Sequence, residues 1–417
     1  MKKYSWLLFL MVGMSVIAQK TITLNELYLA AEHHHPLHAL HDVNRKVAGA
    51  QTAINNSTIL PQINLSGQAT WQSEVTTIPI KFPGIDIPTP PKDQYRALLE
   101  VSQSIYDGGS HRANKDQIMQ TELVDDANAD VQLYSFRESI CRSYFGARIA
   151  DLTITQLQVL INDLKQKENF LNEQIKGGVA SGYQSSVLKV KVLDLDQSMQ
   201  EIKRQKINAV NNLNALTGLS LDTTYHFNGN VQLSNGTRPE YKFYDAQKEL
   251  VTLSLNQALT KYNPRIGAFI QGGYGKPSLN LLSDQFKAYS VIGLRAQWNL
   301  SNLYLHQSSK ERDIAQNQLQ KIDVQKKSFD LQQSIKMKTQ ELEIAHYEDL
   351  LRQDENIIQL YQTILTASNA QFENGITTVN DYTNDANNLT QAFIKRDQHR
   401  VLLNQSIELL NIIQGNK

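Results

Sequence analysis

Five histidines within a short segment are the first candidates for chemistry in this sequence: His33, His34, His35, His38 and His41. On a helix, the pairs His34/His38 and His38/His41 would have the spacing of metal ligands. Pro36 interrupts the first pair, and neither a cysteine nor a carboxylate cluster stands beside the histidines. The sequence therefore favours a solvated polar face here over a metal site.

A second candidate is the glycine-rich run from Gly272 to Lys276, which superficially looks like a phosphate-binding loop. Such a loop needs glycine where Ile270 stands, and serine or threonine where Pro277 stands. No Ser/His/Asp, paired-carboxylate or zinc-ligand pattern falls on an evident scaffold elsewhere in the sequence. We therefore expect neither an enzymatic activity nor a cofactor.

Charge and cysteine content narrow the function further. The 41 Lys and Arg residues balance the 41 Asp and Glu residues, which removes the electrostatic argument for a nucleic-acid partner. The one cysteine, Cys141, allows neither a disulfide framework nor a lipid anchor after a leader. A buried structural role is expected for it.

The beginning of the chain has the features of a secretory signal peptide. Lys2 and Lys3 precede an apolar stretch over residues 7–18, which ends in a Val-x-Ala cleavage pattern. No later segment has the roughly 18 uncharged apolar residues of a membrane helix. We expect residues 1–18 to be removed, the mature chain to leave the cytoplasm, and any membrane insertion to use β-strands.

The rest of the chain is predicted to be an internal duplication. Pro36 and Pro61 match Pro239 and Pro264 at the same offset of 203 residues (239 − 36 and 264 − 61), and a helix is expected to start at the first proline of each copy. We expect a first repeat over residues 19–220, a connector over residues 221–237 and a second repeat over residues 238–417. Each repeat would contain a helix, two strands, a long helix and a return helix.

The two strands of each repeat have a period of two, with one apolar and one polar row. They cover about residues 62–73 and 94–106, and about residues 264–275 and 288–300. Strands of about ten residues with one polar face are typical of tilted membrane strands, and a soluble sheet packed on helices is the alternative. Aromatic residues near the strand ends are candidate membrane-interface anchors: Trp71, Tyr95, Tyr106, Tyr274, Tyr289 and Trp298.

Four strands are too few to close a membrane barrel, and open strand edges are not tolerated in lipid. Three chains would give twelve strands around a water-filled lumen, which predicts a homotrimer. Two proline-free stretches, residues 109–176 and 304–371, would each form a helix roughly 100 Å long that needs coiled-coil packing. The predicted fold class is an α+β membrane protein, a trimeric twelve-stranded β-barrel continued by a long α-helical barrel.

Over essentially the whole mature chain, the sequence resembles the TolC-like family of outer-membrane efflux proteins. The resemblance rests on the helix starts at Pro36 and Pro239, on glycine-centred helix turns, and on two motifs, Leu60-Pro61-Gln62-Ile63-Asn64-Leu65 and Gln103-Ser104-Ile105-Tyr106-Asp107-Gly108-Gly109. The second repeat departs from the family with Trp298-Asn299-Leu300-Ser301-Asn302, where an aromatic-Asp-Gly turn is usual. His33-His34-His35 also replaces a run that normally ends in Asn before the proline.

The resemblance implies an exit duct in the outer membrane of a Gram-negative bacterium, with most of the chain in the periplasm. The duct would conduct substrates passively for a tripartite efflux or type I secretion system. Its implied partners are two further copies of the chain, a periplasmic adaptor (membrane fusion) protein and an inner-membrane pump of RND, ABC or MFS type. A structural or adhesin-like secreted coiled-coil protein without transport activity is the competing interpretation.

The resemblance also implies two kinds of site at the periplasmic tip. Gly178 and Gly375 would form the helix turns that contact the adaptor. Asp381, Asn384 and Asp385 fall at gate positions, where one Asp381 from each of three chains would form an acidic ring. A helix-terminus role is the alternative for Asp381 and the favoured role for Asp385.

Overall fold

The structure is a computed structural model that describes residues 20–77, 84, 89–178, 181–227, 236–281 and 283–415. The expected signal peptide, residues 1–18, lies outside the described residues. The chain divides into two compact units, and each unit takes segments from both halves of the sequence. Unit 1 comprises Met1–His38, Gln132–Arg238 and Leu331–Lys417, and unit 2 comprises Ala39–Val131 and Pro239–Asp330.

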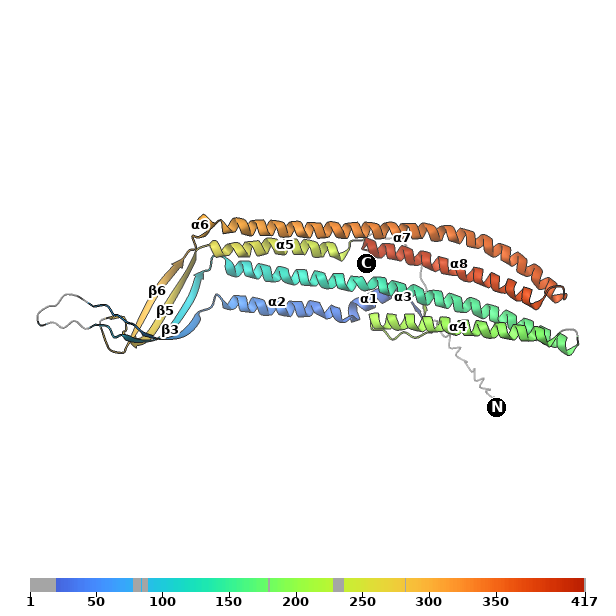
Figure 1. The fold of residues 1–417 in the computed structure, drawn as a ribbon, viewed down its shortest axis with the longest axis horizontal. Coiled ribbons are helices and arrows are strands. Elements are labelled where there is room, and N and C mark those ends of the chain that lie inside the picture. The colour runs from blue at the N-terminus through green and yellow to red at the C-terminus, as the bar shows by residue number, and fades with distance from the viewer. Residues whose placement is uncertain are drawn as a thin grey trace, which may run out of the picture. The chain divides into compact units, whose positions relative to one another are not determined.

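Unit 2 contains a four-stranded antiparallel sheet in the order β2-β3-β5-β6. The strands are β2 (Gln62–Trp71), β3 (Asp93–Tyr106), β5 (Arg265–Lys276) and β6 (Lys287–Gln297), seen side by side in Figure 1. β6 ends three residues earlier than the alternation predicts. The reason is a turn in which the Asn299 side chain accepts a hydrogen bond from the Ser301 N–H at 3.0 Å.

The strand register gives the sheet two chemically different faces. Ile63 pairs with Val101, Val101 with Ile270, and Ile270 with Ile292, so one apolar row crosses all four strands. Residues of this face are strongly exposed; Leu65, for example, retains 80% of its accessible surface. The opposite face carries the alternate, mostly polar residues. The expected alternation of apolar and polar rows is therefore confirmed.

Unit 2 also contains helices, which hydrogen-bond to one another. α2 (Ala39–Ser57) and α5 (Pro239–Leu259) both bond to the N-terminal part of α3 (Ser110–Lys176). The Asn44 amide donates to Asp126 at 2.9 Å, and the Gln117 amide donates to Ser254 at 3.2 Å. α5 begins at Pro239 as expected. α2 begins only at Ala39, after a 3-10 turn over Pro36–His38, because His35 before the proline is extended.

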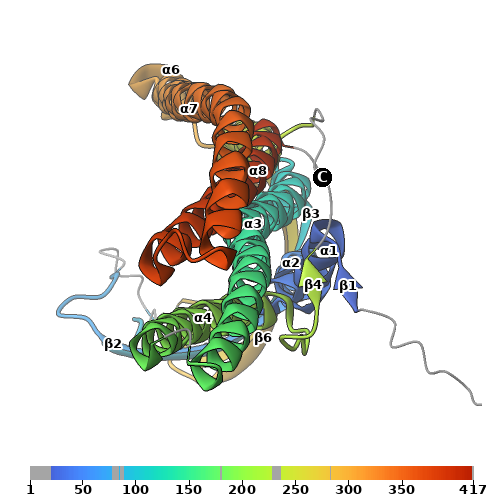
Figure 2. The same ribbon diagram turned by 90° about the vertical axis from the view of Figure 1, so that its right-hand side faces the viewer.

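The long helices α3 and α7 (Gln307–Glu373) each have 67 residues and continue from unit 2 into unit 1. In unit 1, α3 is followed by α4 (Gly182–Thr217) and α7 by α8 (Val379–Gln414), so each pair forms an antiparallel hairpin, as Figure 2 shows. α7 begins later than expected because a one-turn helix, α6 (Asn302–Leu305), precedes it. Within the described residues, none of the helices combines the length and the hydropathy of a membrane-spanning segment.

Two apolar cores hold unit 1 together. The first joins α3, α4 and α8 to α1 (Leu24–His34) and to a small parallel sheet of β1 (Thr21–Ile22) and β4 (His226–Phe227). Its fully buried side chains include Leu27, Tyr144 and Leu213. Cys141 is also buried there, and burial raises the pKa of its thiol, which fits the expected structural role. The second core lies between α3, α4, α8 and the end of α7.

Lys206 is a charged residue among the buried residues of α4. Its side chain is buried, and its ammonium group lies 2.6 Å from a carboxylate oxygen of Asp151 on α3. The same group donates to the backbone carbonyls of Thr223 at 2.6 Å and Tyr225 at 3.3 Å. A buried cation is stable only with such partners. Lys206 thus anchors the segment after α4 to the helical hairpin.

Candidate functional site

Four of the proposed interface aromatics lie on the apolar face of the sheet. Trp71, Tyr95 and Tyr274 belong to the apolar row by register, and all three are exposed. Tyr106 joins them because of a register shift after Ser104, which pairs Tyr106 with the apolar-row residue Ile266. Trp298 follows β6, is exposed, and donates its indole N–H to the Tyr262 carbonyl at 3.0 Å.

Tyr289 lies on the opposite, polar face of the sheet. It pairs with Gly273, whose neighbours in β5, Gly272 and Tyr274, belong to the apolar row. A β-carbon on Gly273 would come within 2.1 Å of the Tyr289 ring, so the ring covers the glycine. Its expected place among the membrane-interface aromatics therefore does not fit the register of β6.

The turns of the two helical hairpins contain the glycines expected at the tip. Gly178 and Gly375 have φ values of +75° and +70°, in the left-handed region that favours glycine. After α7, the Ile376 N–H bonds to the Gln371 carbonyl at 2.8 Å and the Gly375 N–H to the Phe372 carbonyl at 3.0 Å, which closes the last turn. Ile376 itself is 75% exposed.

Asp381 completes the cap of α8. The Thr378 side chain accepts from the Asp381 N–H at 3.2 Å, and Asp381 Oδ2 accepts from the Thr378 hydroxyl at 2.6 Å. Asp381 and Asn384 are exposed on one side of the helix, whereas Asp385 is half-buried. The structure thus gives Asp381 a capping role, and a place in an acidic ring remains a prediction.

A cross-link between the hairpins escaped the sequence analysis. The Tyr382 hydroxyl of α8 donates to Asp163 Oδ2 of α3 at 2.8 Å, and its ring stacks on Phe372 of α7 with centroids 5.1 Å apart. Lys167 of α3 lies 5.4 Å from the Tyr382 ring centroid and 3.1 Å from Glu373 Oε1. This ion pair holds the pKa of Glu373 below its ordinary value. Tyr382 and Lys167 therefore join α3, α7 and α8 close to their ends.

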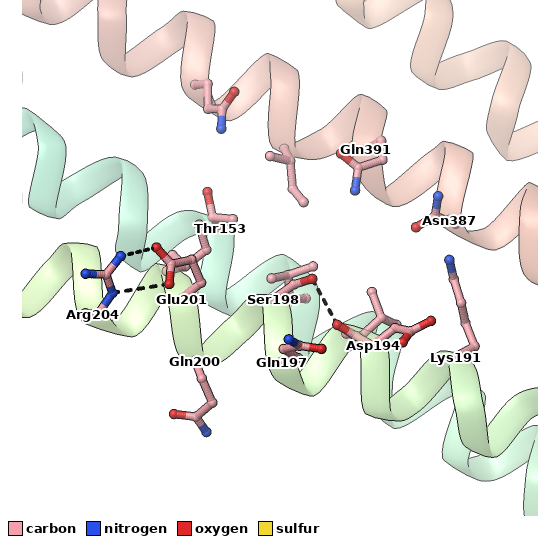
Figure 3. A pocket seen from close by; sticks show the side chains of 15 residues that line it. Thr153, Lys191, Asp194, Gln197, Ser198, Gln200, Glu201, Arg204, Asn387 and Gln391 are labelled. Atoms are coloured by element: carbon pink, nitrogen blue, oxygen red, sulfur yellow. Dashed lines mark hydrogen bonds and ion pairs between the residues drawn. The ribbon is translucent and has the colours of Figure 1, made fainter.

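An open groove of about 870 Å³ runs between α3, α4 and α8 in unit 1. Its lining contains many amide side chains, among them Gln197, Gln200, Asn387 and Gln391, which Figure 3 shows. On α4, the Arg204 guanidinium donates to both carboxylate oxygens of Glu201, at 2.6 and 3.2 Å. The groove is open, and its amide groups can hydrogen-bond a protein surface.

The histidine segment is tied into the protein by separate contacts. His35 Nδ1 accepts from the Leu37 N–H at 3.2 Å, and its ring packs on Phe136 with centroids 4.3 Å apart. In unit 2, His41 lies between Asp126 and Asp130, at 3.2 and 3.3 Å. Over the described ranges, no three His, Cys, Asp or Glu side chains group as a metal site.

Part of the chain matches a known protein family. Residues 27–219 match the model of the outer membrane efflux protein family. A comparison with curated proteins gives no match. The matched residues include α1, β2, β3, both helices of the first hairpin and the joints between them. The family is one of channels and not of enzymes.

Solved structures extend the likeness over the rest of the fold. The outer membrane protein VceC of Vibrio cholerae has 14% identity and a TM-score of 0.65, with 94% of this chain and 96% of that chain covered. The CmeC outer membrane channel of Campylobacter jejuni has 15% identity, a TM-score of 0.64, and coverages of 94% and 85%. The MtrE outer membrane channel of Neisseria gonorrhoeae has 14% identity and a TM-score of 0.64, with 94% of this chain and 89% of that chain covered. At such identities the likeness shows the fold.

The sequence resemblance to outer-membrane efflux proteins is therefore confirmed over residues 27–219, and the fold of the chain is similar to that of solved outer-membrane channels.

Proposed function

We propose that three copies of this protein form the outer-membrane exit duct of a tripartite efflux or type I secretion system. The observation that carries the proposal is the sheet of unit 2, which has an exposed apolar face and ends in the edge strands β2 and β6. Unpaired strand edges are not tolerated in lipid. Pairing β2 of one copy with β6 of the next would close twelve strands around a polar lumen.

The partners that we propose are a periplasmic adaptor and an inner-membrane pump, which would supply the energy of export. The hairpin turns support contact with an adaptor, because Tyr183 and Ile376 present apolar side chains that are 76% and 75% exposed. Apolar groups held out on rigid turns are suited to binding a protein partner. The amide-lined groove beside α8 offers hydrogen-bonding groups along the same hairpins.

For the gate, we propose that Asp381 and Asn384 face the lumen at the constricted end of the helices. The hydrogen bonds of the cap engage Oδ2 of Asp381, so capping and membership of an acidic ring are compatible. Three carboxylates brought close together repel one another and attract multivalent cations. The Tyr382–Asp163 hydrogen bond supports a closed state, because moving α8 away from α3 requires breaking it.

Two measurements on the purified full-length protein test this function. The mass of the protein in detergent should be that of a trimer, and the trimer should conduct ions in planar bilayers. A stable membrane-inserted monomer, or a trimer without conductance, would contradict the duct and favour a structural coiled-coil protein. Within a conducting trimer, Asp381→Asn should lower cation selectivity and weaken block by trivalent cations, whereas the matched change Asp385→Asn should do much less.

A further inference from the structure

The polar face of the sheet is strongly basic. By register, its charged residues are Arg96, Arg265, Lys287 and Arg295, with Glu100 as the one carboxylate among the paired residues of the four strands. Each chain therefore contributes a net charge of +3 to this face, from four cations and one anion. The whole chain, in contrast, has a formal net charge of zero. The imbalance is a property of this face and not of the composition.

Two aromatic rings lie on the same basic face, each over a glycine of the neighbouring strand. Tyr289 covers Gly273, and a β-carbon on Gly293 would lie 2.8 Å from the Phe269 ring. Any larger residue at either glycine would push the ring away. An aromatic side chain that packs over a cross-strand glycine is held by the sheet. The sheet thus fixes both rings on this face, although a face that only contacts water needs no aromatic side chains.

The cations and the rings form one array. The Arg295 guanidinium lies 4.9 Å from the centroid of Phe269, and it lies 3.9 Å from Glu100 Oε1. Glu100 Oε2 also accepts from the Gln271 amide at 2.6 Å, so the single carboxylate is already engaged within the sheet. Next to Tyr289 along this face, the register places Leu98 across Gly273. Apolar and aromatic surface is therefore bordered by cations.

We propose that this basic aromatic face is a recognition site in the barrel for anionic amphipathic solutes with an aromatic ring, such as aromatic carboxylates. The ring of such a solute would stack on Phe269 or Tyr289, and its anionic group would lie beside Arg295, Arg96 or Lys287. The inference rests on the proposed duct, in which the polar face of the sheet lines the lumen. In a trimer, the three faces form a basic ring of the kind that selects anions.

The charge part of the proposal is tested by reversal potentials in planar bilayers under a potassium chloride gradient at low ionic strength, where screening is weak. The triple variant R96Q/K287Q/R295Q should shift the permeability ratio toward cations relative to the parent channel. The double variant R96K/R295K, which keeps the charge, should not. An unchanged ratio in the triple variant, or an equal shift in the charge-preserving variant, overturns the proposal.

The aromatic part is tested by current block with 1-naphthoate, with acetate as the probe that has the carboxylate but no ring. Phe269→Leu and Tyr289→Leu keep apolar volume and remove the ring, and each should weaken naphthoate block about threefold to tenfold, as expected for one lost aromatic stack. Block by acetate should stay the same. Equal naphthoate block in the parent and both variants overturns the proposal. Absence of any conducting trimer contradicts the duct itself and is a different result.

Discussion

The hydrogen bond from Tyr382 to Asp163 makes the sharpest prediction about opening of the duct. Tyr382→Phe removes the hydroxyl but keeps the ring that stacks on Phe372 and lies near Lys167. Burial and the neighbouring Asp163 carboxylate raise the pKa of Tyr382, so its hydroxyl is a proton donor throughout the neutral range. The substitution therefore deletes one interaction and leaves the packing of α8 intact.

The expected effect follows from the strength of that interaction. A hydrogen bond to a charged group contributes about 1.5–3 kcal/mol, and partial solvent screening of the half-buried Asp163 reduces this to about 1–2 kcal/mol in each chain. If the three chains open together, the closed state loses about 3–6 kcal/mol. This corresponds to a change of roughly 10²–10⁴ in the closed-to-open equilibrium.

Single-channel recording in planar bilayers measures this equilibrium as the fraction of time spent in the low-conductance state. Tyr382→Phe should reduce that fraction strongly. Adding Asp163→Ala, which removes the acceptor of the same hydrogen bond, should reduce it little further. Tyr183→Phe is the matched control, since Tyr183 is 76% exposed at the other hairpin. If Tyr382→Phe trimers gate as the parent does, the hydrogen bond does not hold the duct closed.

Two further predictions concern the sheet and the core of unit 1. Leu99→Arg, on the apolar face, should reduce membrane insertion by about 2–4 kcal/mol, whereas Ser102→Arg on the polar face should be tolerated; equal trimer yields from outer-membrane fractions would contradict a lipid-facing apolar row. Burial raises the pKa of Glu408, which accepts a hydrogen bond from Tyr28 at 2.9 Å. A raised folded-state pKa means that the contribution of Glu408 to stability is present in acid and is lost as the pH rises through the raised value. Unfolding by denaturant should therefore show a smaller loss of stability between acidic and neutral pH in Glu408→Gln than in the parent; identical pH profiles would refute this.

The periodic parts of the fold could be predicted from the sequence because they depend on local pattern. The alternation in β6 also places Tyr289 on the polar face, because Ile292 and Leu294 of the apolar row are even-numbered and Tyr289 is odd-numbered. The interface prediction for Tyr289 rests on its position near a strand end and takes no account of which row of the strand it belongs to. Tyr106 required knowledge of the bulge, which two consecutive apolar residues, Ile105 and Tyr106, do not reveal.

The candidate site was predictable in part for the same reason. The Thr378-x-x-Asp381 spacing is a capping signature that can be recognised in the sequence, and the structure contains both of its hydrogen bonds. The Tyr382–Asp163 bond joins residues 219 positions apart, and no local pattern specifies such a pair. The basic face could not be predicted either, because its cations belong to different strands that only the register of the four strands brings together.

The two joints between strand and long helix solve one geometric problem in different ways. After β3, Gly108 has a φ of +75°, and a β-carbon there would lie 2.9 Å from the Asn263 side chain, which donates to the Gly108 carbonyl at 2.7 Å. After β6, the chain instead forms α6 and turns at His306 with a φ of +51°. The two predicted repeats therefore differ in how each strand is joined to its long helix. A chain built from two copies of residues 19–220 would lack the joint that contains Trp298 and His306. A chain built from two copies of residues 238–417 would lack Gly108, where the close approach of Asn263 leaves no room for a β-carbon.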